Sequence, residues 1–290
     1  MNIQKYMAFV KAVEYGSFTR AAEALNYTQS GISRMINDLE LEWDVSLFER
    51  GRAGISLTSD GIKLLPQLQR ICNEHEILMT QIEELQNLQT GIIRIGTFSS
   101  VATHWLPNII KYFKKDYPNI DFELLLGDYT EIESWILEGR VDFGFLRLPT
   151  SNAQLDTIVL EEDRLLVIIP QDHSFADADN FPIRELLSSP FMLLEKGAKA
   201  EISEIFEKHQ ITPQISFTTW DDYAIMSMVE NGLGISILPE LILNRIPYQI
   251  FAKELEIPAY RTIGIAMRER KSLSLAAKSF LEYLPYRKKM

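Results

Sequence analysis

Hydrogen-bonding and cationic side chains gather on one face of a helix predicted over residues 28–40. The opposite face is apolar and repeats at i, i+3, i+4 and i+7, at Ile32, Met35, Ile36 and Leu39. This spacing fixes that face to a core and turns the other outward. The polar face and its tip consist of Thr28, Gln29, Ser30, Ser33, Arg34 and Asn37. Such side chains suit the base edges and phosphates of a DNA major groove. A helix face that is merely solvated would carry the same residue types.

A second cationic group follows at residues 47–61. Arg50 and Arg52 stand beside Gly51 and Gly54, a composition typical of a tight turn between two short extended stretches. A hairpin of this kind can present two guanidinium groups to phosphates or to a narrow minor groove. The alternative is an ordinary hairpin with solvated arginines, because glycine-rich turns often carry exposed charges.

Short helices must position these two groups. Ser17 can cap a helix that contains Ala21 and Ala22, whose small side chains let a second helix cross closely. Asn26 provides the turn, and Thr28 can cap the helix that bears the polar face. Residues 1–60 are therefore predicted to form a helix-turn-helix followed by a wing.

The next segment, residues 58–90, is predicted to be one long helix. Its apolar seam is spaced alternately four and three residues apart, at Leu64, Leu68, Ile71, His75, Leu78, Ile82 and Leu85. A single stripe with heptad spacing indicates a helix that pairs with another helix. A packed polar position explains His75 better than a metal or pH-sensing role does.

Charge and cysteine content restrict the classes of function. The formal net charge is −11, and residues 1–60 hold six Lys and Arg against eight Asp and Glu. We therefore expect the non-specific binding of a single copy to DNA to be weak, and affinity depends on where its few cations lie. Cys72 is the only cysteine, which excludes a disulfide framework and favours a small buried side chain over a reactive thiol. No run approaches the ~20 apolar residues of a membrane helix, and the start does not resemble a signal peptide, so we expect a cytoplasmic protein.

From Gly91 onward the pattern alternates between strands and helices. Strands are predicted at residues 92–98, 120–126, 142–148, 164–170, 191–194, 215–219 and 234–239. Helices are predicted near residues 101–117, 130–138, 200–209, 221–231 and 274–284. Alternation of this kind predicts an α/β fold of parallel sheets with helices on both faces. The segment is too long for one small sheet, so we expect two lobes with a ligand crevice at the carboxyl ends of the strands.

Three motifs in the first 61 residues resemble the DNA-binding domain of LysR-type transcriptional regulators. They are F-T-x-A-A-x-x-L at 18–25, T-Q-S-x-x-S-R-x-I-x-x-L-E at 28–40 and L-F-E-R-x-R-x-G-x-x-L-T-x-x-G at 47–61. The resemblance implies a winged helix-turn-helix over residues 1–60 and a dimerising linker helix over 58–90. It also implies a two-lobed regulatory domain over 91–290 that resembles type 2 periplasmic binding proteins.

The same resemblance implies a homodimer, commonly a homotetramer, that binds promoter DNA and a small-molecule effector without a cofactor. It places the effector between a first lobe (residues 91–162 and 266–290) and a second lobe (163–265). Effector binding would change the angle between the lobes and, with it, the spacing of the bound DNA half-sites.

Predicted effector contacts lie at strand ends. In the first lobe they are Ser99, Ser100, Gly127, Asp128 and Arg147, and in the second lobe Glu195, Thr219 and Trp220. Ser99 and Ser100 could bind an anionic group together with helix N-terminal amides, although Ser99 is also a candidate N-cap. Arg147 suggests a carboxylate effector, with a structural ion pair as the alternative. Trp220 could equally be lobe core.

Acidic residues complicate the anion hypothesis. Asp128, Glu195, Asp221 and Asp222 all lie near predicted strand ends. Carboxylates could meet an ammonium group, so a zwitterionic or cationic effector, such as an amino acid or an amine, stays open.

Two rival classes of protein share a two-lobed α/β domain. An enzyme would need a catalytic motif, but the sequence has no P-loop, GxGxxG, HExxH or GxSxG, and its four histidines are scattered. A solute-binding transport protein would need an export signal and has no use for a helix-turn-helix. A ligand-binding or catalytic protein without a regulatory role is the alternative that remains.

Overall fold

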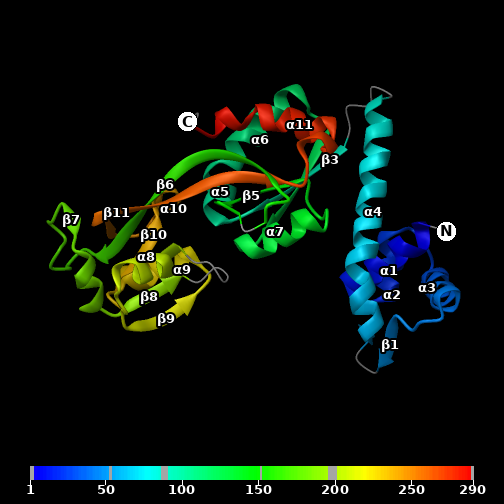
Figure 1. Cartoon of the computed structure of the whole chain (residues 1–290), viewed down its shortest axis with the longest axis horizontal. Helices are drawn as coiled ribbons and strands as arrows, with labels where there is room; N and C mark the ends of the chain where they lie inside the picture. The colour runs from blue at the N-terminus through cyan, green and yellow to red at the C-terminus, as the bar shows by residue number, and fades with distance from the viewer. Residues whose placement is uncertain (1–2, 52–53, 86–90, 151, 195–200, 289–290) are drawn as a thin grey trace. The chain divides into compact units, whose positions relative to one another are not determined.

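A computed structural model describes residues 3–51, 54–85, 91–150, 152–194 and 201–288 of the chain (Figure 1). The chain divides into two compact units, the first from α1 to α4 and the second from β3 to the C-terminus. In the described part of the chain, no helix is both long enough and apolar enough to cross a membrane.

The first unit is a small helical domain with a hairpin. Its elements are α1 (Ile3–Tyr15), α2 (Phe18–Ala24), α3 (Gln29–Trp43), β1 (Phe48–Gly51), β2 (Gly54–Leu57) and α4 (Ser59–Leu85). Two predicted caps are confirmed: the Ser17 hydroxyl accepts from the Arg20 amide at 3.4 Å, and the Thr28 hydroxyl accepts from the Gly31 amide at 3.1 Å. Asn26 has a φ of 57°, in the left-handed region, which forms the predicted turn.

Helix α4 begins where the sequence predicts, because the Thr58 hydroxyl accepts from the Gly61 amide at 3.0 Å. Leu68 is buried in the core of the first unit. Further along the seam, Ile71, Leu78 and Ile82 are 41%, 52% and 38% exposed. Three of the seven predicted seam residues are therefore exposed within one chain.

The second unit alternates strands and helices. Its strands are β3 (Gly91–Thr97), β4 (Ile120–Leu126), β5 (Phe143–Leu148), β6 (Asp156–Pro170), β7 (Asn180–Phe181), β8 (Phe191–Leu194), β9 (Ile215–Thr219), β10 (Ser236–Pro239) and β11 (Ile250–Met267). Its α-helices are α5 (Ser99–His104), α6 (Leu106–Asp116), α7 (Tyr129–Leu137), α8 (Glu201–His209), α9 (Asp222–Glu230), α10 (Glu240–Leu243) and α11 (Leu275–Glu282). The α/β class is confirmed.

The main sheet is mixed, which corrects the expectation of parallel sheets, whereas the small sheet of β8 and β9 is parallel as predicted. The main sheet has the order β10-β6-β11-β5-β3-β4. β3 pairs in parallel with β4 and β5, but β11 runs antiparallel to both β5 and β6. β11 was not predicted because Pro258 and charged side chains interrupt its apolar pattern, and a register shift lies between Glu254 and Ala259.

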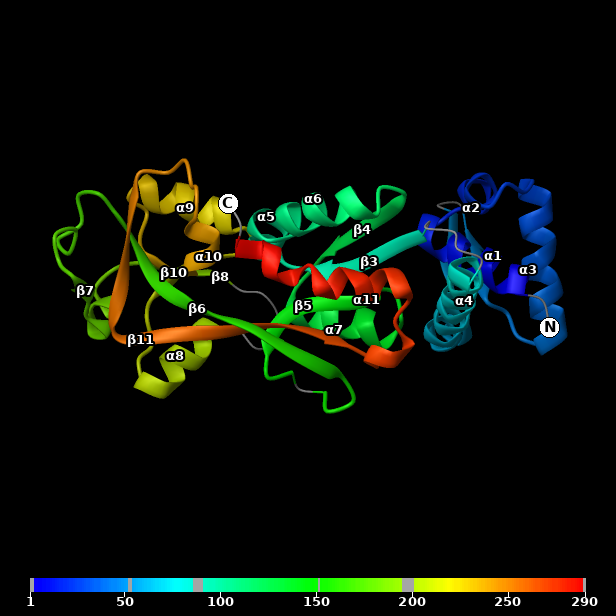
Figure 2. The ribbon, with the colours of Figure 1, turned by 90° about the horizontal axis from the view of Figure 1, so that it is seen from above.

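Two separate apolar cores define two lobes within this unit. The first lobe is built around β3–β5, α5–α7 and α11, and the second around β8–β10, α8 and α9. β6 and β11 are the long paired strands that contribute to both cores (Figure 2). Ile263 and Ile265 pack in the first core, so the chain re-enters the first lobe a few residues before the expected boundary at 266.

Candidate functional site

Helix α3 separates its two faces sharply. Ile32, Ile36 and Leu39 are between 0% and 1% exposed, which confirms the predicted apolar face. The outward residues are Thr28, Gln29, Ser30, Arg34 and Asn37, all exposed, and Ser33, which is half-buried. Contact of these six residues with DNA stays a prediction.

The predicted wing is an antiparallel hairpin of β1 and β2, in which Arg50 pairs with Ile55. Glu40, near the end of α3, fixes the start of β1. One of its carboxylate oxygens accepts from the Leu47 amide at 2.6 Å and from the Phe48 amide at 3.2 Å. Arg52 lies outside the described residues. Helix α3 and the hairpin are thus joined by a charge-assisted contact.

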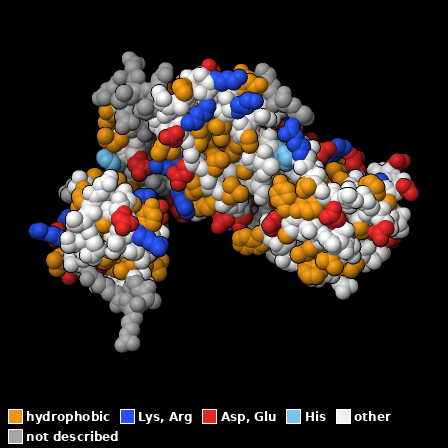
Figure 3. All heavy atoms as spheres, turned by 180° about the vertical axis from the view of Figure 1, so that it is seen from behind, with side chains coloured by type: hydrophobic (Ala, Val, Ile, Leu, Met, Phe, Trp, Pro, Cys, Tyr) orange, Lys and Arg blue, Asp and Glu red, His pale blue; other side chains and the backbone are white. Residues whose placement is uncertain are grey.

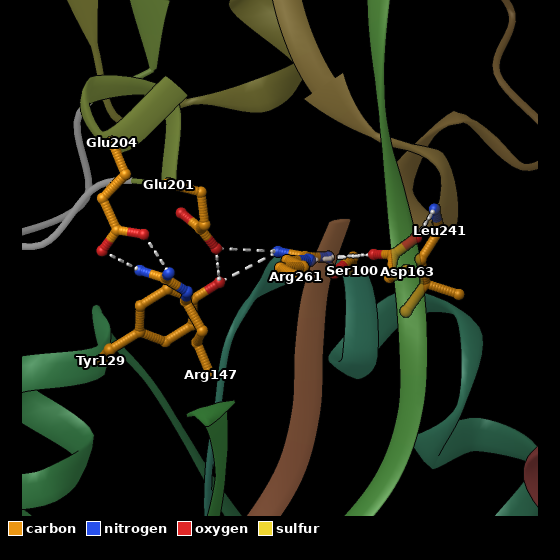
Figure 4. Close-up of polar contacts among 8 residues, drawn as sticks. All are labelled: Ser100, Tyr129, Arg147, Asp163, Glu201, Glu204, Leu241 and Arg261. Atoms are coloured by element: carbon orange, nitrogen blue, oxygen red, sulfur yellow. Dashed lines mark hydrogen bonds and ion pairs between the residues drawn. The ribbon is translucent and has the colours of Figure 1, made fainter. Parts of the chain in front are cut away.

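A buried polar cluster occupies the junction of the two lobes (Figure 4). At its centre is Arg261 on β11, whose side chain is 5% exposed. Its guanidinium donates to Asp163 on β6 at 2.6 and 2.9 Å, and to the Ser100 hydroxyl at 2.8 Å. The other oxygen of Asp163 accepts from the Leu241 amide at 2.9 Å. A buried charge of this kind is tolerated only because it is paired and hydrogen-bonded.

Helix α8 of the second lobe reaches the same cluster. Arg261 donates to the Tyr129 hydroxyl at 3.0 Å, and that hydroxyl donates to Glu201 at 2.6 Å. One turn further along α8, both carboxylate oxygens of Glu204 accept from Arg147 at the end of β5, one of them at 2.8 Å. The two lobes are therefore bridged by side chains of α8.

Burial and neighbouring charges determine the protonation states of Tyr129 and Arg261. Burial raises the pKa of the Tyr129 hydroxyl, which keeps it protonated and able to donate to Glu201. Burial by itself lowers the pKa of Arg261, but Tyr129, Asp163 and Glu201 raise it overall. Arg261 is thus a permanent cation at the junction.

The effector contacts predicted in the first lobe differ in what they do. Ser100 is buried against Arg261, and Arg147 forms the ion pair that was the alternative to a ligand contact. Asp128 and Glu131 form a reciprocal cap on α7, with contacts of 2.8 and 2.9 Å. A Cβ on Gly127 would lie 2.5 Å from the Trp135 ring, so packing explains this glycine.

Ser99 is the first residue of α5, whose N-cap is Phe98, so the N-cap alternative for Ser99 is wrong. The long helix predicted over 101–117 is split at Trp105 into α5 and α6.

The residues predicted in the second lobe are less closely connected. Trp220 is 66% exposed, so it is not part of the lobe core. The Thr219 hydroxyl accepts from the Asp221 amide at 3.3 Å, and Asp221 caps α9. Asp222 is buried. Glu195 lies outside the described residues. These local roles leave fewer carboxylates available to a ligand at the junction of the lobes than the sequence suggests.

Five residues of the cluster were not predicted from the sequence: Tyr129, Asp163, Glu201, Glu204 and Arg261. A signal exists for two of them, because Glu201 and Glu204 lie three residues apart at the start of a predicted helix. Asp163 and Arg261 are 98 residues apart, and only the pairing of β6 with β11 brings them together.

A helix-turn-helix with a wing, joined to a two-lobed α/β domain with a polar junction, defines a class of protein: a ligand-responsive DNA-binding regulator. Residues 3–62 match the family described as bacterial regulatory helix-turn-helix proteins of the lysR type, and residues 86–287 match the LysR substrate binding domain. The chain belongs to the LysR family of transcriptional regulators, with a DNA-binding and an effector-binding domain.

Relatives match along most of their length. The uncharacterized HTH-type transcriptional regulator YvbU of Bacillus subtilis is 32% identical, with 97% of each chain covered. The probable regulator LrrA of Synechococcus elongatus is 34% identical over 92% of this chain and 90% of its own. The fold matches that of full-length CbnR, solved in complex with its target DNA, with a TM-score of 0.73 at 20% identity, covering 99% of this chain and 100% of that one.

Proposed function

We propose that the chain is a cytoplasmic homo-oligomer that binds promoter DNA through α3 and the wing. An effector that binds at the junction of the two lobes modulates this binding. The protein acts as a regulator and not as a catalyst. Among the described residues, no group of three or more His, Cys, Asp or Glu is placed to hold a metal ion.

The exposed polar face of α3 carries the proposal. Gln29 and Ser30 lie in the first turn of the helix, and Arg34 and Asn37 extend the same face. The first turns of a recognition helix are the part that reaches base edges, and an arginine there can bind a guanine with two hydrogen bonds. The CbnR complex, whose fold matches, supports DNA as the partner.

The exposed seam of α4 supports a homodimer through this helix. Ile71, Leu78 and Ile82 repeat with heptad spacing and are 38–52% exposed in one chain. A dimer places two recognition helices on two half-sites, and a tetramer places four. Because each copy contributes few cations, several copies supply more phosphate contacts than one copy can.

The charges of the second unit give no reason to add it to the DNA interface. Residues 91–290 hold 21 Lys and Arg against 28 Asp and Glu, and both kinds of side chain lie on the face shown in Figure 3. Mixed charges do not create the one-sided potential that attracts a polyanion. DNA affinity is therefore assigned to the first unit.

The test is binding of the purified protein to the DNA upstream of its own gene, measured by fluorescence anisotropy at several salt concentrations. Selective binding that weakens steeply with salt is expected. Arg34→Ala should weaken it by about 1–3 kcal/mol, roughly 5- to 150-fold, and Ser33→Ala by less.

Lys271→Ala is the matched control, because it also removes one exposed cation but lies in the second unit. It should leave affinity unchanged. If a folded oligomer shows no sequence-selective binding, the alternative of a ligand-binding protein without a regulatory role takes its place.

A further inference from the structure

Helix α8 presents two carboxylates to the first lobe. Ile202 and Ile205 are buried in the second core and hold the helix there. Glu201 and Glu204 lie one turn apart, with Cβ atoms about 5–6 Å from each other in an α-helix. Glu204 pairs with Arg147, and Glu201 meets the Tyr129 hydroxyl at 2.6 Å and the Arg261 guanidinium at 3.9 Å.

The Arg147 contact has the form that a carboxylate ligand would adopt. The two guanidinium nitrogens face the two oxygens of Glu204, which is the bidentate geometry of strong arginine–carboxylate recognition. The Arg147 side chain is 20% exposed and the Glu204 side chain 54%. A screened pair of this kind contributes little net stability and can be exchanged.

Charge balance limits which ligand can replace the glutamates. The residues in Figure 4 include two cations, Arg147 and Arg261, and three carboxylates, Asp163, Glu201 and Glu204. Removal of both glutamates would leave one excess positive charge, whereas a dianion in their place restores the original balance. A cationic ligand would instead leave Arg147 facing a second cation, which is unfavourable at short range.

We propose that Glu201 and Glu204 are an internal dicarboxylate that bridges the two lobes, and that the effector is a small dicarboxylic acid that replaces them. One effector carboxylate binds Arg147, and the other binds the Tyr129 hydroxyl beside Arg261. This inference rests on the proposed function, since it assigns the effector to the junction of the lobes. Exchange frees α8 from the first lobe and so changes the angle between the lobes.

The test uses the full-length protein and the dicarboxylates oxalate, malonate, succinate, glutarate and adipate at constant ionic strength. Binding is measured by calorimetric titration and by the rise in thermal midpoint that a ligand of the native state produces. Acetate and putrescine serve as the monocarboxylate and the diamine. We expect one or two adjacent chain lengths to bind, and acetate and putrescine not to bind.

Three variants locate the site. Glu204→Gln removes the charge of the internal competitor and should tighten dicarboxylate binding about two- to fivefold, the range of an exposed ion pair. Arg147→Gln should abolish binding. Glu207→Gln, an exposed glutamate on the same helix, is the matched control and should bind like the wild type.

A charge swap guards against variants that fail to fold. Arg147→Glu combined with Glu204→Arg keeps an ion pair between the lobes, so it should unfold near the wild-type midpoint but no longer bind dicarboxylates. The proposal is overturned if no dicarboxylate binds the wild type or Glu204→Gln, if the swap still binds them, or if putrescine binds and Glu204→Gln weakens it. DNA binding without added acids is measured separately, so the loss of this inference leaves the proposed function standing.

Discussion

The Arg261 guanidinium on β11 lies 2.6 Å from the Asp163 carboxylate on β6, and both side chains are about 95% buried. These two strands are the connections between the lobes, so the ion pair joins the two connections to each other. Buried pairs differ from exposed ones because removal of one partner leaves a desolvated charge.

Asp163→Ala should therefore destabilise the protein by about 3–5 kcal/mol, because Arg261 loses its closest counter-charge. Urea denaturation followed by circular dichroism measures this loss. Glu282→Ala is the control, since Glu282 pairs with Arg270 at the surface and should cost less than about 1 kcal/mol. If both variants lose the same free energy of unfolding, the buried Asp163–Arg261 pair contributes no more to stability than a surface ion pair.

The seam of α4 gives a prediction about assembly. Leu78→Asp places a charge on the exposed apolar stripe of both subunits. Loss of two buried leucine side chains, each worth about 1.5–3 kcal/mol, should raise the dimer dissociation constant by roughly a hundredfold or more. Sedimentation velocity over a range of concentrations reports the change.

Ile62→Asp is the control for this experiment. Ile62 is 60% exposed on the same helix but lies almost opposite Leu78 at 100° per residue. It should leave the oligomeric state intact. Dissociation by both variants would place the interface elsewhere on the helix.

His104, at the end of α5, predicts a dependence of stability on pH. Burial lowers the pKa of His104, although a hydrogen bond to the Ile242 carbonyl opposes the shift. The unfolded chain takes up a proton near pH 6.5, while the folded chain resists it. Stability from this residue is thus present above about pH 6.5 and is lost as the pH falls toward the folded pKa.

His104→Gln should flatten the fall in urea midpoint between pH 7 and pH 5. Thr103→Ala, an exposed neighbour without a titrating group, should keep the wild-type profile. An unchanged profile for His104→Gln would assign the acid sensitivity to other groups.

Cys72 should be unreactive in the native protein. It is buried in the core of the first unit, and burial, reinforced by Glu76, raises its pKa to about 11. Only about one thiol in a thousand is then ionised at pH 8, and the thiolate is the reactive form. Labelling with a thiol reagent should be slow in buffer and fast in denaturant. Ser59→Cys, at an exposed position in a Cys72→Ala background, should react quickly in both.

Local signals predicted the first unit well. The burial of Ile32, Ile36 and Leu39 follows from helical spacing alone, and Thr28 caps α3 through a contact within its own turn. The lobes were harder to predict, because the first half of β6 and all of β11 gain their strand character from each other. Their pairing joins residues such as Asp163 and Arg261, and no local pattern contains that information.

For Ser100, local sequence predicted the position of the side chain but not its partner. Its place after β3 predicted a polar contact near the cleft, and the structure provides one. The partner is Arg261, 161 residues away, instead of a ligand. Position along the chain thus indicates that a side chain faces the junction, whereas only the tertiary fold decides what it meets there.

The ladder between β6 and β11 restricts how the lobes can move. Both connections between the lobes are hydrogen-bonded to each other, so we expect them to move together as one ribbon and not as two independent linkers. A pair of hydrogen-bonded strands bends and twists more easily than it stretches. We therefore expect the lobes to rotate about these strands without moving apart. A small rotation at the Asp163–Arg261 pair would then displace residues at the far ends of the lobes by a larger distance.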